Sequence, residues 1–411
     1  MSINMNQYLE ELLERTESHV KLGLENTHRA LEILGNPHCD YRSILVAGSN
    51  GKGTTAAYIF RGLELSGLRV GLFSSPHIVR LNERLRTCEG TISDDELKEL
   101  VDDTFAICKA GGVRLTFFEL MTVAGARYFS RKKCDVVVVE VGLGGRLDST
   151  NVHPNFASVV TSIGMEHTAI LGDDIDTIAA EKLATVKPGG KLICDGLAPW
   201  AGVARRVVAE KEARMLDASQ AEIDPEVEAC LSYPFFRENF QLAQTLLQTL
   251  EITDMRLLQE VARTRLFGRM EPLAYKKRHV LLDCAHNPVA LEKMGPYILE
   301  WTRPFKRRIL ATTLLADKEL DPVTRSFWDS FDAVALFPLN HPRGRKSPAE
   351  LFPLIAETSQ RNLMVAPSLQ EGLSRVDDIL LEDEHSCLVV TGSMYLLGEV
   401  YPLMEPHLDP R

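Results

Sequence analysis

Apolar runs alternate with amphipathic segments along most of the chain, and this alternation predicts strands followed by helices. The apolar run at residues 44–47 turns through a glycine-rich segment into an amphipathic helix, and a second apolar run follows at residues 68–73. A strand, a helix and a second strand in this order form a β-α-β unit, whose two strands lie parallel. The first part of the chain is therefore predicted to contain a parallel sheet.

The most strand-like segment of the chain is residues 134–140, a continuous apolar run that ends in Glu140. A strand without alternating polar positions is typical of a parallel sheet that is covered on both faces. A further strand is predicted at residues 157–163. Helices are predicted at residues 5–15, 24–34, 94–109 and 175–186, and another from residue 116 onward.

A second alternation of strands and helices begins after residue 278. The stretch 195–228 is acidic and irregular, a helix is predicted at 237–250, and residues 266–269 and the basic run 276–278 are candidates for a connection between domains. The later strands are predicted at residues 279–283, 308–312, 333–337 and 386–391, and the later helices at 290–301 and 348–357. This pattern predicts a second parallel sheet of domain size, and the chain is divided into residues 1–270 and 271–411.

Composition and charge limit the class of protein. The 411 residues are 45% hydrophobic and 25% charged, which is typical of a soluble protein of two or three domains. The net charge of -11 argues against broad binding to nucleic acid or to an anionic membrane. No apolar run reaches membrane-spanning length, the N-terminus lacks a signal-peptide pattern, and the 8 cysteines show no C-x-x-C spacing for zinc or a redox pair. A cytoplasmic location is expected.

The segment GSNGKGTT at residues 48–55 has the form of a phosphate-binding loop. Glycines permit positive φ angles and close approach of the backbone, so that successive N–H groups and the following helix N-terminus can face phosphate oxygens. Lys52 supplies a positive charge, and Thr54 or Thr55 a hydroxyl for Mg²⁺. One extra glycine, Gly53, separates the lysine from the threonine of the common motif. A tight strand-to-helix turn without a ligand is the alternative interpretation.

Polar side chains follow the next predicted strands at the carboxyl edge of the same sheet. Glu140 ends its strand before the glycine-rich segment 142–145, and Glu166 with His167 follows the strand at 157–163. The helix after that strand carries Lys182. Ligands of open parallel sheets bind at this edge. Taken one at a time, the glutamate is consistent with a solvated strand end, the histidine with a polar niche, and the lysine with a helix surface.

Many segments of the chain match one family in order and spacing. They are LGLENTHRALEILGNP, VAGSNGKGTTAA, SSPHIVRLNERLR, ISDDEL, TFFELMT, EVGLGGRLDSTNV, VVTSIGMEHTAILG, IAAEK, FGRME, LLDCAHNP and VTGSMYLLGEV. With them the chain resembles the folylpolyglutamate synthase/dihydrofolate synthase family, a branch of the Mur-type ATP-dependent ligases. The resemblance implies a P-loop parallel-sheet ATPase domain followed by a smaller Rossmann-like α/β domain. It also implies ATP-dependent addition of L-glutamate to dihydropteroate, to reduced folate polyglutamates, or to both, through an acyl phosphate.

The resemblance also implies roles for individual residues of this sequence. The catalytic residues would be Lys52, His167 and Lys182, and the metal ligands Thr54, Ser75, Glu140, His167 and Lys182. ATP would be bound by Asn50, Gly51, Lys52, Gly53, Thr54, Thr55, Asn239, Arg269 and Asp283. The pterin-bearing substrate would contact Lys21, Leu22, Gly23, Thr116, Phe117, Phe118, Glu119, Leu147, Asp148 and Ser149, and the incoming glutamate His286 and Asn287. Two Mg²⁺ ions would be bound, and the family allows for a carbamylated Lys182 and a monovalent cation.

The chain departs from the family pattern at several of these places. Cys284 stands where glycine is usual, Val289 replaces a frequent histidine, and Glu166 replaces aspartate before the metal histidine. Residues 183–185 differ from the usual Ala-Gly-Ile after the lysine, and Phe235-Phe236 stand where His-Gln usually precedes the adenine-binding asparagine. The proposed catalytic groups themselves are all present.

Two other functions remain open from the residues alone. One is a Mur-type amino-acid ligase that acts on a carboxylate other than a folate. The other is a nucleotide-dependent switch without ligase chemistry, which would bind or hydrolyse ATP without responding to glutamate. In each case the expected partners are small molecules, and a monomer without nucleic-acid or membrane partners is expected.

Overall fold

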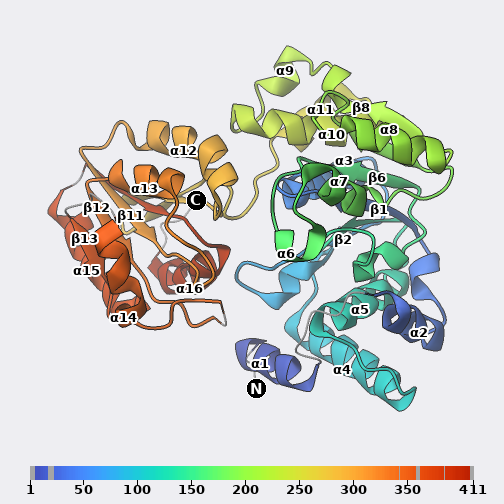
Figure 1. Cartoon of the computed structure of the whole chain (residues 1–411), viewed down its shortest axis with the longest axis horizontal. Helices are drawn as coiled ribbons and strands as arrows, with labels where there is room; N and C mark the ends of the chain where they lie inside the picture. The colour runs from blue at the N-terminus through green and yellow to red at the C-terminus, as the bar shows by residue number, and fades with distance from the viewer. Residues whose placement is uncertain (1–4, 17–22, 342, 358–361, 384, 408–411) are drawn as a thin grey trace. The chain divides into compact units, whose positions relative to one another are not determined.

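The computed structural model describes residues 5–16, 23–341, 343–357, 362–383 and 385–407 (Figure 1). The chain forms two compact units that divide between Thr264 and Arg265. The sequence predicts a boundary after residue 270, whereas the structure assigns residues 265–270 to the second unit. None of the helices in the described residues is long and apolar enough to cross a membrane.

The first unit is built on an eight-stranded sheet with the order β4-β3-β2-β5-β1-β6-β7-β8. The six strands from β2 to β8 run parallel, and β3 with β4 adds an antiparallel hairpin at one edge. The strands are β1 (Arg42–Ala47), β2 (Val70–Phe73), β3 (Leu85–Thr87), β4 (Gly90–Thr91), β5 (Val136–Glu140), β6 (Ala157–Val160), β7 (Lys191–Cys194) and β8 (Arg214–Asp217). The four valines of β5 are buried, as its continuous apolar sequence predicts.

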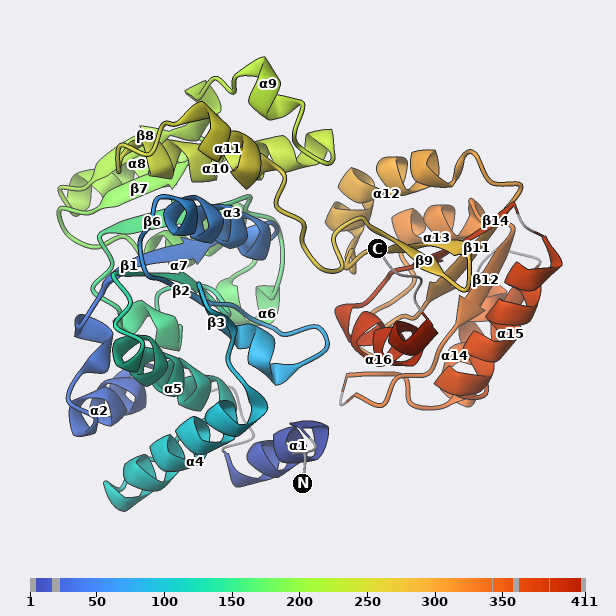
Figure 2. The ribbon, with the colours of Figure 1, turned by 180° about the vertical axis from the view of Figure 1, so that it is seen from behind.

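Helices cover both faces of this sheet, and alternate residues of one strand belong to opposite cores. Figure 2 shows α3, α10 and α11 on one side of the sheet and α5 on the other. Ile44 and Val46 of β1 belong to the core with α3, α10 and α11, whereas Leu45 and Ala47 belong to the opposite core. The helices are α1 (Met5–Arg15), α2 (Glu25–Ile33), α3 (Lys52–Leu65), α4 (Asp94–Ala110), α5 (Phe117–Arg131), α6 (Thr168–Leu171), α7 (Ile175–Leu183), α8 (Ala201–Glu210), α9 (Pro225–Glu228), α10 (Arg237–Gln248) and α11 (Met255–Ala262).

The second unit contains a six-stranded sheet with the order β13-β12-β11-β14-β10-β9. Its strands run parallel except for β9, which pairs with β10 as a hairpin. The strands are β9 (Glu271–Tyr275), β10 (Arg278–Leu282), β11 (Arg307–Thr312), β12 (Ala333–Leu336), β13 (Leu363–Val365) and β14 (Ser386–Val390). The helices are α12 (Pro288–Thr302), α13 (Pro322–Asp329), α14 (Pro348–Leu351), α15 (Leu369–Glu382) and α16 (Met394–Met404) (Figure 1).

The two α/β units confirm the predicted fold class, and several details differ from the prediction. The stretch 195–228 is not irregular throughout, because it contains α8, β8 and α9. The basic run 276–278 is a hairpin turn leading into β10 inside the second unit, with Lys276 and Lys277 at φ values of 48° and 62°. The helix predicted at 348–357 ends as α14 and continues as a 3-10 helix, since Pro353 cannot donate a helical hydrogen bond.

Candidate active site

The phosphate-binding segment lies between the carboxyl end of β1 and the start of α3. Gly48 and Gly51 have φ values of 139° and 85°, which side-chain-bearing residues rarely adopt. A Cβ atom at Gly51 would collide with Oδ1 of Asn239, which also accepts a hydrogen bond of 3.3 Å from the hydroxyl of Thr55. The predicted nucleotide residue Asn239, on α10, therefore borders the loop directly.

Hydrogen bonds from the end of β6 hold the loop in place. The Ser49 N–H donates to the carbonyl of Ser162 at 2.7 Å, and the Ser49 hydroxyl accepts from the Gly164 N–H at 3.0 Å. The Thr161 hydroxyl donates to the Asn50 carbonyl at 2.7 Å. A loop whose shape is fixed in this way can present its N–H groups to phosphate without reorganisation.

Two lysines share one carbonyl group of this loop. Lys52 Nζ donates to the carbonyls of Gly48 and Ser49, both at 2.9 Å, and Lys182 Nζ donates to the Gly48 carbonyl at 3.0 Å. The Lys182 side chain is only 2% exposed, and its amine also pairs with Oε1 of Glu166 at 2.8 Å. The sequence predicts both lysines at this edge of the sheet, and in the structure both amines donate to the Gly48 carbonyl.

Electrostatics at this point follow from burial and from the two positive charges. Burial lowers the pKa of the Lys182 amine, and the nearby Glu166 carboxylate opposes that shift. Burial would raise the pKa of Glu166, but the charges of Lys182 and Lys52 outweigh it, so the pKa is lowered. Glu166 is therefore ionised at neutral pH and partly neutralises the cluster.

A carboxylate approaches the loop from the neighbouring strand. Glu140, the last residue of β5, is 6% exposed, and its Oε2 accepts a hydrogen bond of 3.1 Å from the Ser75 N–H. A Cβ atom at Gly53 would lie 3.6 Å from both carboxylate oxygens, so the start of α3 is close to Glu140. Three of the predicted metal-binding segments thus meet in one place.

The fourth predicted metal segment adopts an unusual backbone. His167 has a φ of 48° at the start of α6 and is exposed. Among the residues that the structure describes, no three His, Cys, Asp or Glu side chains are grouped closely enough to hold a metal ion. The predicted set instead combines the Glu140 carboxylate and the hydroxyls of Thr54 and Ser75, which are oxygen ligands suited to a hard divalent cation such as Mg²⁺, with His167 and Lys182. The metal-binding role of this set stays a prediction.

The predicted acceptor-binding residues have structural bonds of their own. Thr116 and Glu119 form a capping box at the start of α5, with the Thr116 N–H donating to Glu119 Oε2 at 2.8 Å and the Glu119 N–H donating to the Thr116 hydroxyl at 3.3 Å. Phe118 packs against the glycine-rich segment, because a Cβ atom at Gly142 would collide with its ring. Ser149 joins this helix through a 2.8 Å hydrogen bond between its hydroxyl and that of Thr122.

Asp148 organises the loop between β5 and β6. Its buried carboxylate accepts from the N–H groups of Leu143 at 2.7 Å and Thr150 at 3.0 Å, and from the Thr150 hydroxyl. Burial raises its pKa, although these hydrogen bonds oppose the shift. Its neighbour Leu147 is partly exposed. The carboxylate therefore has a structural role that the sequence did not indicate, and its contact with substrate stays a prediction.

The predicted residues of the second unit lie at the carboxyl end of β10. The buried carboxylate of Asp283 accepts from the N–H groups of Met270 at 3.0 Å and Ala285 at 2.8 Å. Burial raises its pKa, whereas the positive charge of Arg269 opposes this. Asn287 caps α12 by accepting from the Ala290 N–H at 2.8 Å, and His286 Nδ1 lies 2.8 Å from the Cys284 carbonyl.

Three of the predicted acceptor-binding residues lie near the N-terminus of the first unit. Lys21 and Leu22 are outside the described residues, and Gly23 is partly exposed.

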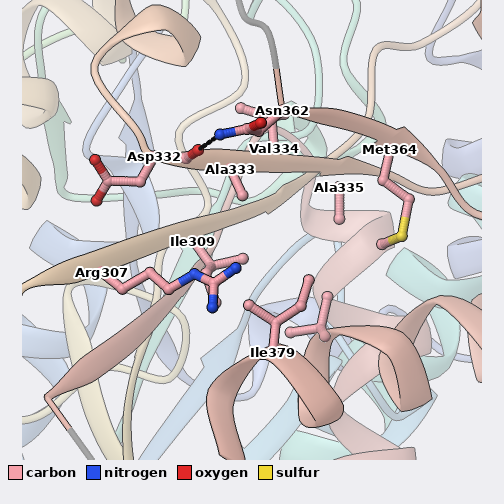
Figure 3. Close-up of a pocket in the computed structure, with 10 residues that line it drawn as sticks. Arg307, Ile309, Asp332, Ala333, Val334, Ala335, Asn362, Met364 and Ile379 are labelled. Atoms are coloured by element: carbon pink, nitrogen blue, oxygen red, sulfur yellow. Dashed lines mark hydrogen bonds between the residues drawn. The ribbon is translucent and has the colours of Figure 1, made fainter. Parts of the chain in front are cut away.

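The second unit also contains a pocket of about 260 Å³ at the amino ends of β11, β12 and β13 (Figure 3). Arg307, Asp332 and Asn362 line its rim, and the Asn362 side chain donates to the Asp332 carbonyl at 2.9 Å. This end of the parallel sheet is opposite to the end that carries Asp283. The pocket is therefore separate from the predicted substrate residues of this unit.

The sequence did not single out Ser49 and Gly145. The only signals were their positions within glycine-rich segments. A Cβ atom at Gly145 would lie 2.5 Å from the Glu181 carbonyl oxygen and 2.9 Å from the Lys182 Cα. The backbone of α7 thus lies directly against the glycine-rich segment 142–145, which we call the glycine loop. This close approach requires a residue without a side chain at position 145.

Comparisons with known proteins agree with these features. Residues 267–403 match the profile of the family described as "Dihydrofolate synthetase, C-terminal domain". The Escherichia coli dihydrofolate synthase/folylpolyglutamate synthase is 32% identical over 356 residues, which cover 82% of each protein. A probable bifunctional folylpolyglutamate synthase/dihydropteroate synthase of Haloferax volcanii is 36% identical over 297 residues, which span 69% of this chain and 35% of that protein.

A solved structure supports the same assignment. A bifunctional folylpolyglutamate synthase/dihydrofolate synthase crystallised with Mn, AMPPNP and L-glutamate has 26% sequence identity and a TM-score of 0.78, with 98% of each chain covered. The two α/β units and the phosphate loop place this chain among the Mur-type ATP-dependent ligases. Within that class, the chain belongs to the folylpolyglutamate synthase/dihydrofolate synthase family.

Proposed function

We propose that this chain uses ATP to join L-glutamate to dihydropteroate, to a reduced folate polyglutamate, or to both. The observation that carries the proposal is the cluster at the phosphate loop, where Lys52 and Lys182 share the Gly48 carbonyl and Glu140 lies beside Gly53. The relative with 26% identity that was crystallised with AMPPNP and L-glutamate supports the choice of nucleotide and amino acid. The preferred acceptor, a monomeric state and a cytoplasmic location stay predictions.

The reaction must convert a carboxylate into a group that an amine can displace. A carboxylate oxygen of the acceptor attacks the γ-phosphorus of ATP, and ADP leaves. The α-amine of glutamate then attacks the acyl carbon, and the resulting tetrahedral intermediate expels phosphate to give the amide. Lys52 would neutralise charge on the transferring phosphoryl group, and the N–H groups of the loop would hold the phosphates in line.

The metal site would be formed by Glu140, Ser75, Thr54 and His167, with Lys182 as a further ligand after reaction with CO₂. Bound Mg²⁺ would neutralise phosphate charge and polarise the phosphoryl group. Carbamylation requires a neutral amine, and burial favours that form of Lys182. The carbamate would replace a positive head group by a negative one beside the metal ligands. The proposal also includes a monovalent cation, which the family resemblance allows for.

The assay that tests the proposal is release of phosphate from ATP with and without each substrate. We expect release to require both L-glutamate and either dihydropteroate or tetrahydrofolate. Release that needs glutamate but is supported only by a non-folate acid would instead favour another Mur-type ligase. Release that is unaffected by glutamate would favour a nucleotide-dependent switch.

His286→Ala is expected to raise the KM for glutamate at least tenfold and to change the KM for ATP less than threefold, because His286 is proposed to dock the incoming amino acid. Steady-state kinetics with each substrate varied in turn provide the measurement. His385→Ala removes an exposed histidine of the same unit and serves as the control, with both constants unchanged. An increase in the KM for ATP alone would show that the glutamate site is misplaced.

A further inference from the structure

A partly buried lysine, Lys187, joins the segment after α7 to the turn that carries Ser149. Lys187 Nζ donates to the Asn151 carbonyl at 2.7 Å and to the Asn151 side-chain oxygen at 2.9 Å. Asn151 belongs to a 3-10 turn at Ser149–Val152, which lies 36 positions away in the sequence. No assigned catalytic or binding role accounts for Lys187.

Asn151 is also hydrogen-bonded to the residues that follow the glycine-rich segment 142–145. Its side-chain nitrogen donates to the Arg146 carbonyl at 3.1 Å, and its N–H donates to the Asp148 carbonyl at 2.8 Å. The Asp148 carboxylate in turn holds the N–H of Leu143. Lys187 therefore contacts a residue of the turn that is bonded directly to Arg146 and Asp148, and through Asp148 to Leu143.

The same loop is fixed to α7 at a second place. The Arg146 N–H donates to the Glu181 carbonyl and its Nε to Glu181 Oε1, both at 2.9 Å. Gly145 lies against the backbone of Glu181 and Lys182, where a Cβ atom would collide. These contacts connect the turn, the segment 142–146 and α7, so they link the position of Ser149 to that of Lys182.

Removing part of the Lys187 side chain from water costs free energy, which indicates that its contact with Asn151 has a role. Burial and the positive charge of Lys211 lower the pKa of Lys187 to about 8. Both oxygens of Asn151 that accept from it are neutral, so they compensate only part of the lost hydration. A lysine that only filled space here could be replaced by an apolar side chain without that cost.

We propose that Lys187 is a positioning residue for the acceptor substrate, which acts through Asn151 to hold the Ser149 turn in register with α7 and Lys182. The inference rests on the proposed function, because the turn is assigned to the acceptor. It predicts that loss of Lys187 weakens use of the acceptor and leaves use of ATP intact.

The test compares Lys187→Met with Lys211→Met. Lys211 is a matched control, since it donates to the carbonyls of Ala184 and Val186 in the same segment without contacting the turn. We expect Lys187→Met to raise the KM for the acceptor about tenfold, as for a lost charged hydrogen bond. The KM for ATP is expected to stay within twofold, and Lys211→Met to change neither constant beyond twofold.

A double-mutant cycle separates positioning from general destabilisation. Lys187→Met is expected to have a smaller effect in an Asn151→Ala background, because the bond to the Asn151 side-chain oxygen is already lost there and only the bond to the backbone carbonyl remains. If Lys187→Met does not fold, Asn151→Ala decides the question alone, and a raised KM for acceptor with unchanged KM for ATP supports the proposal. Equal effects of Lys187→Met and Lys211→Met, or additive effects in the cycle, would overturn it. If phosphate release by the native enzyme does not depend on the acceptor, the proposed function itself is contradicted.

Discussion

Replacement of Lys52 by alanine is expected to lower turnover about a thousandfold or more while the protein stays folded. The Lys52 amine donates to two carbonyls of its own loop, at Gly48 and Ser49, and the loop has further bonds to the end of β6. Loss of the Lys52 side chain is therefore expected to leave the protein folded. The transferring phosphoryl group, however, would lose the side chain proposed to neutralise its charge.

The measurement is kcat with saturating substrates, alongside a thermal unfolding curve. Lys98→Ala provides a matched control, because it removes a lysine from the partly exposed Lys98–Asp102 ion pair on α4, which contributes little to stability. We expect native turnover in the control and native unfolding behaviour in both variants. Turnover of Lys52→Ala within tenfold of the native value would contradict the assignment of the phosphate loop.

Lys182→Ala is expected to reduce turnover at least a hundredfold, with partial recovery on addition of acetate or formate. The reason is the proposed carbamate, whose oxygen ligands a short carboxylate can replace in the space that the shorter side chain leaves. The Lys182 amine bonds to the Gly48 carbonyl and to Glu166, so the space that the shorter side chain leaves borders the phosphate loop. Lys182→Met fills the same space and should show no recovery.

A direct measurement of the modification accompanies this variant. Native protein equilibrated with ¹³C-labelled CO₂ is expected to show one carbamate carbon resonance that Lys182→Ala lacks. Native activity that is independent of CO₂, together with no carbamate signal, would contradict the modification. In that case Lys182 would act as a cation bound to Glu166 and to the phosphate loop.

The overall fold could be predicted because its central strands are continuous apolar runs. The valines of β5 and the apolar residues of β1 are buried on both faces, so no polar alternation obscured them. The strand β8 was missed, since its four residues at Arg214–Asp217 are only partly buried at an edge of the sheet. The helix predicted at 175–186 ends as α7 at Leu183, ahead of Lys187 and Pro188, where proline restricts the preceding residue.

The residues of the candidate site could be predicted only where they belong to a short sequence motif. Lys52 and Gly51 stand in a recognisable loop, and Glu140 stands at a strand end beside glycines. By contrast, the contact between Lys187 and Asn151 joins residues 36 positions apart, and neither has a local signal. The close approach of Gly145 to α7 likewise depends on tertiary packing.

Several residues assigned to substrates also hold the backbone around them. Asn287 caps α12, and Asp148 holds Leu143 and Thr150. Polar side chains at loop and helix ends commonly satisfy nearby N–H groups. Sequence patterns alone do not separate this structural role from a role in binding. Because Asp148 and Asn287 hold the backbone, we expect substitutions there to change stability as well as substrate use.

The central claim is that the acceptor carboxylate is activated by phosphoryl transfer before the amide forms. It is tested most directly with an acceptor whose carboxylate carries ¹⁸O, ATP and L-glutamate. The account predicts that each phosphate released contains one ¹⁸O atom and that the amide retains the other. Phosphate without ¹⁸O, released while the glutamyl product forms, would contradict the acyl phosphate route.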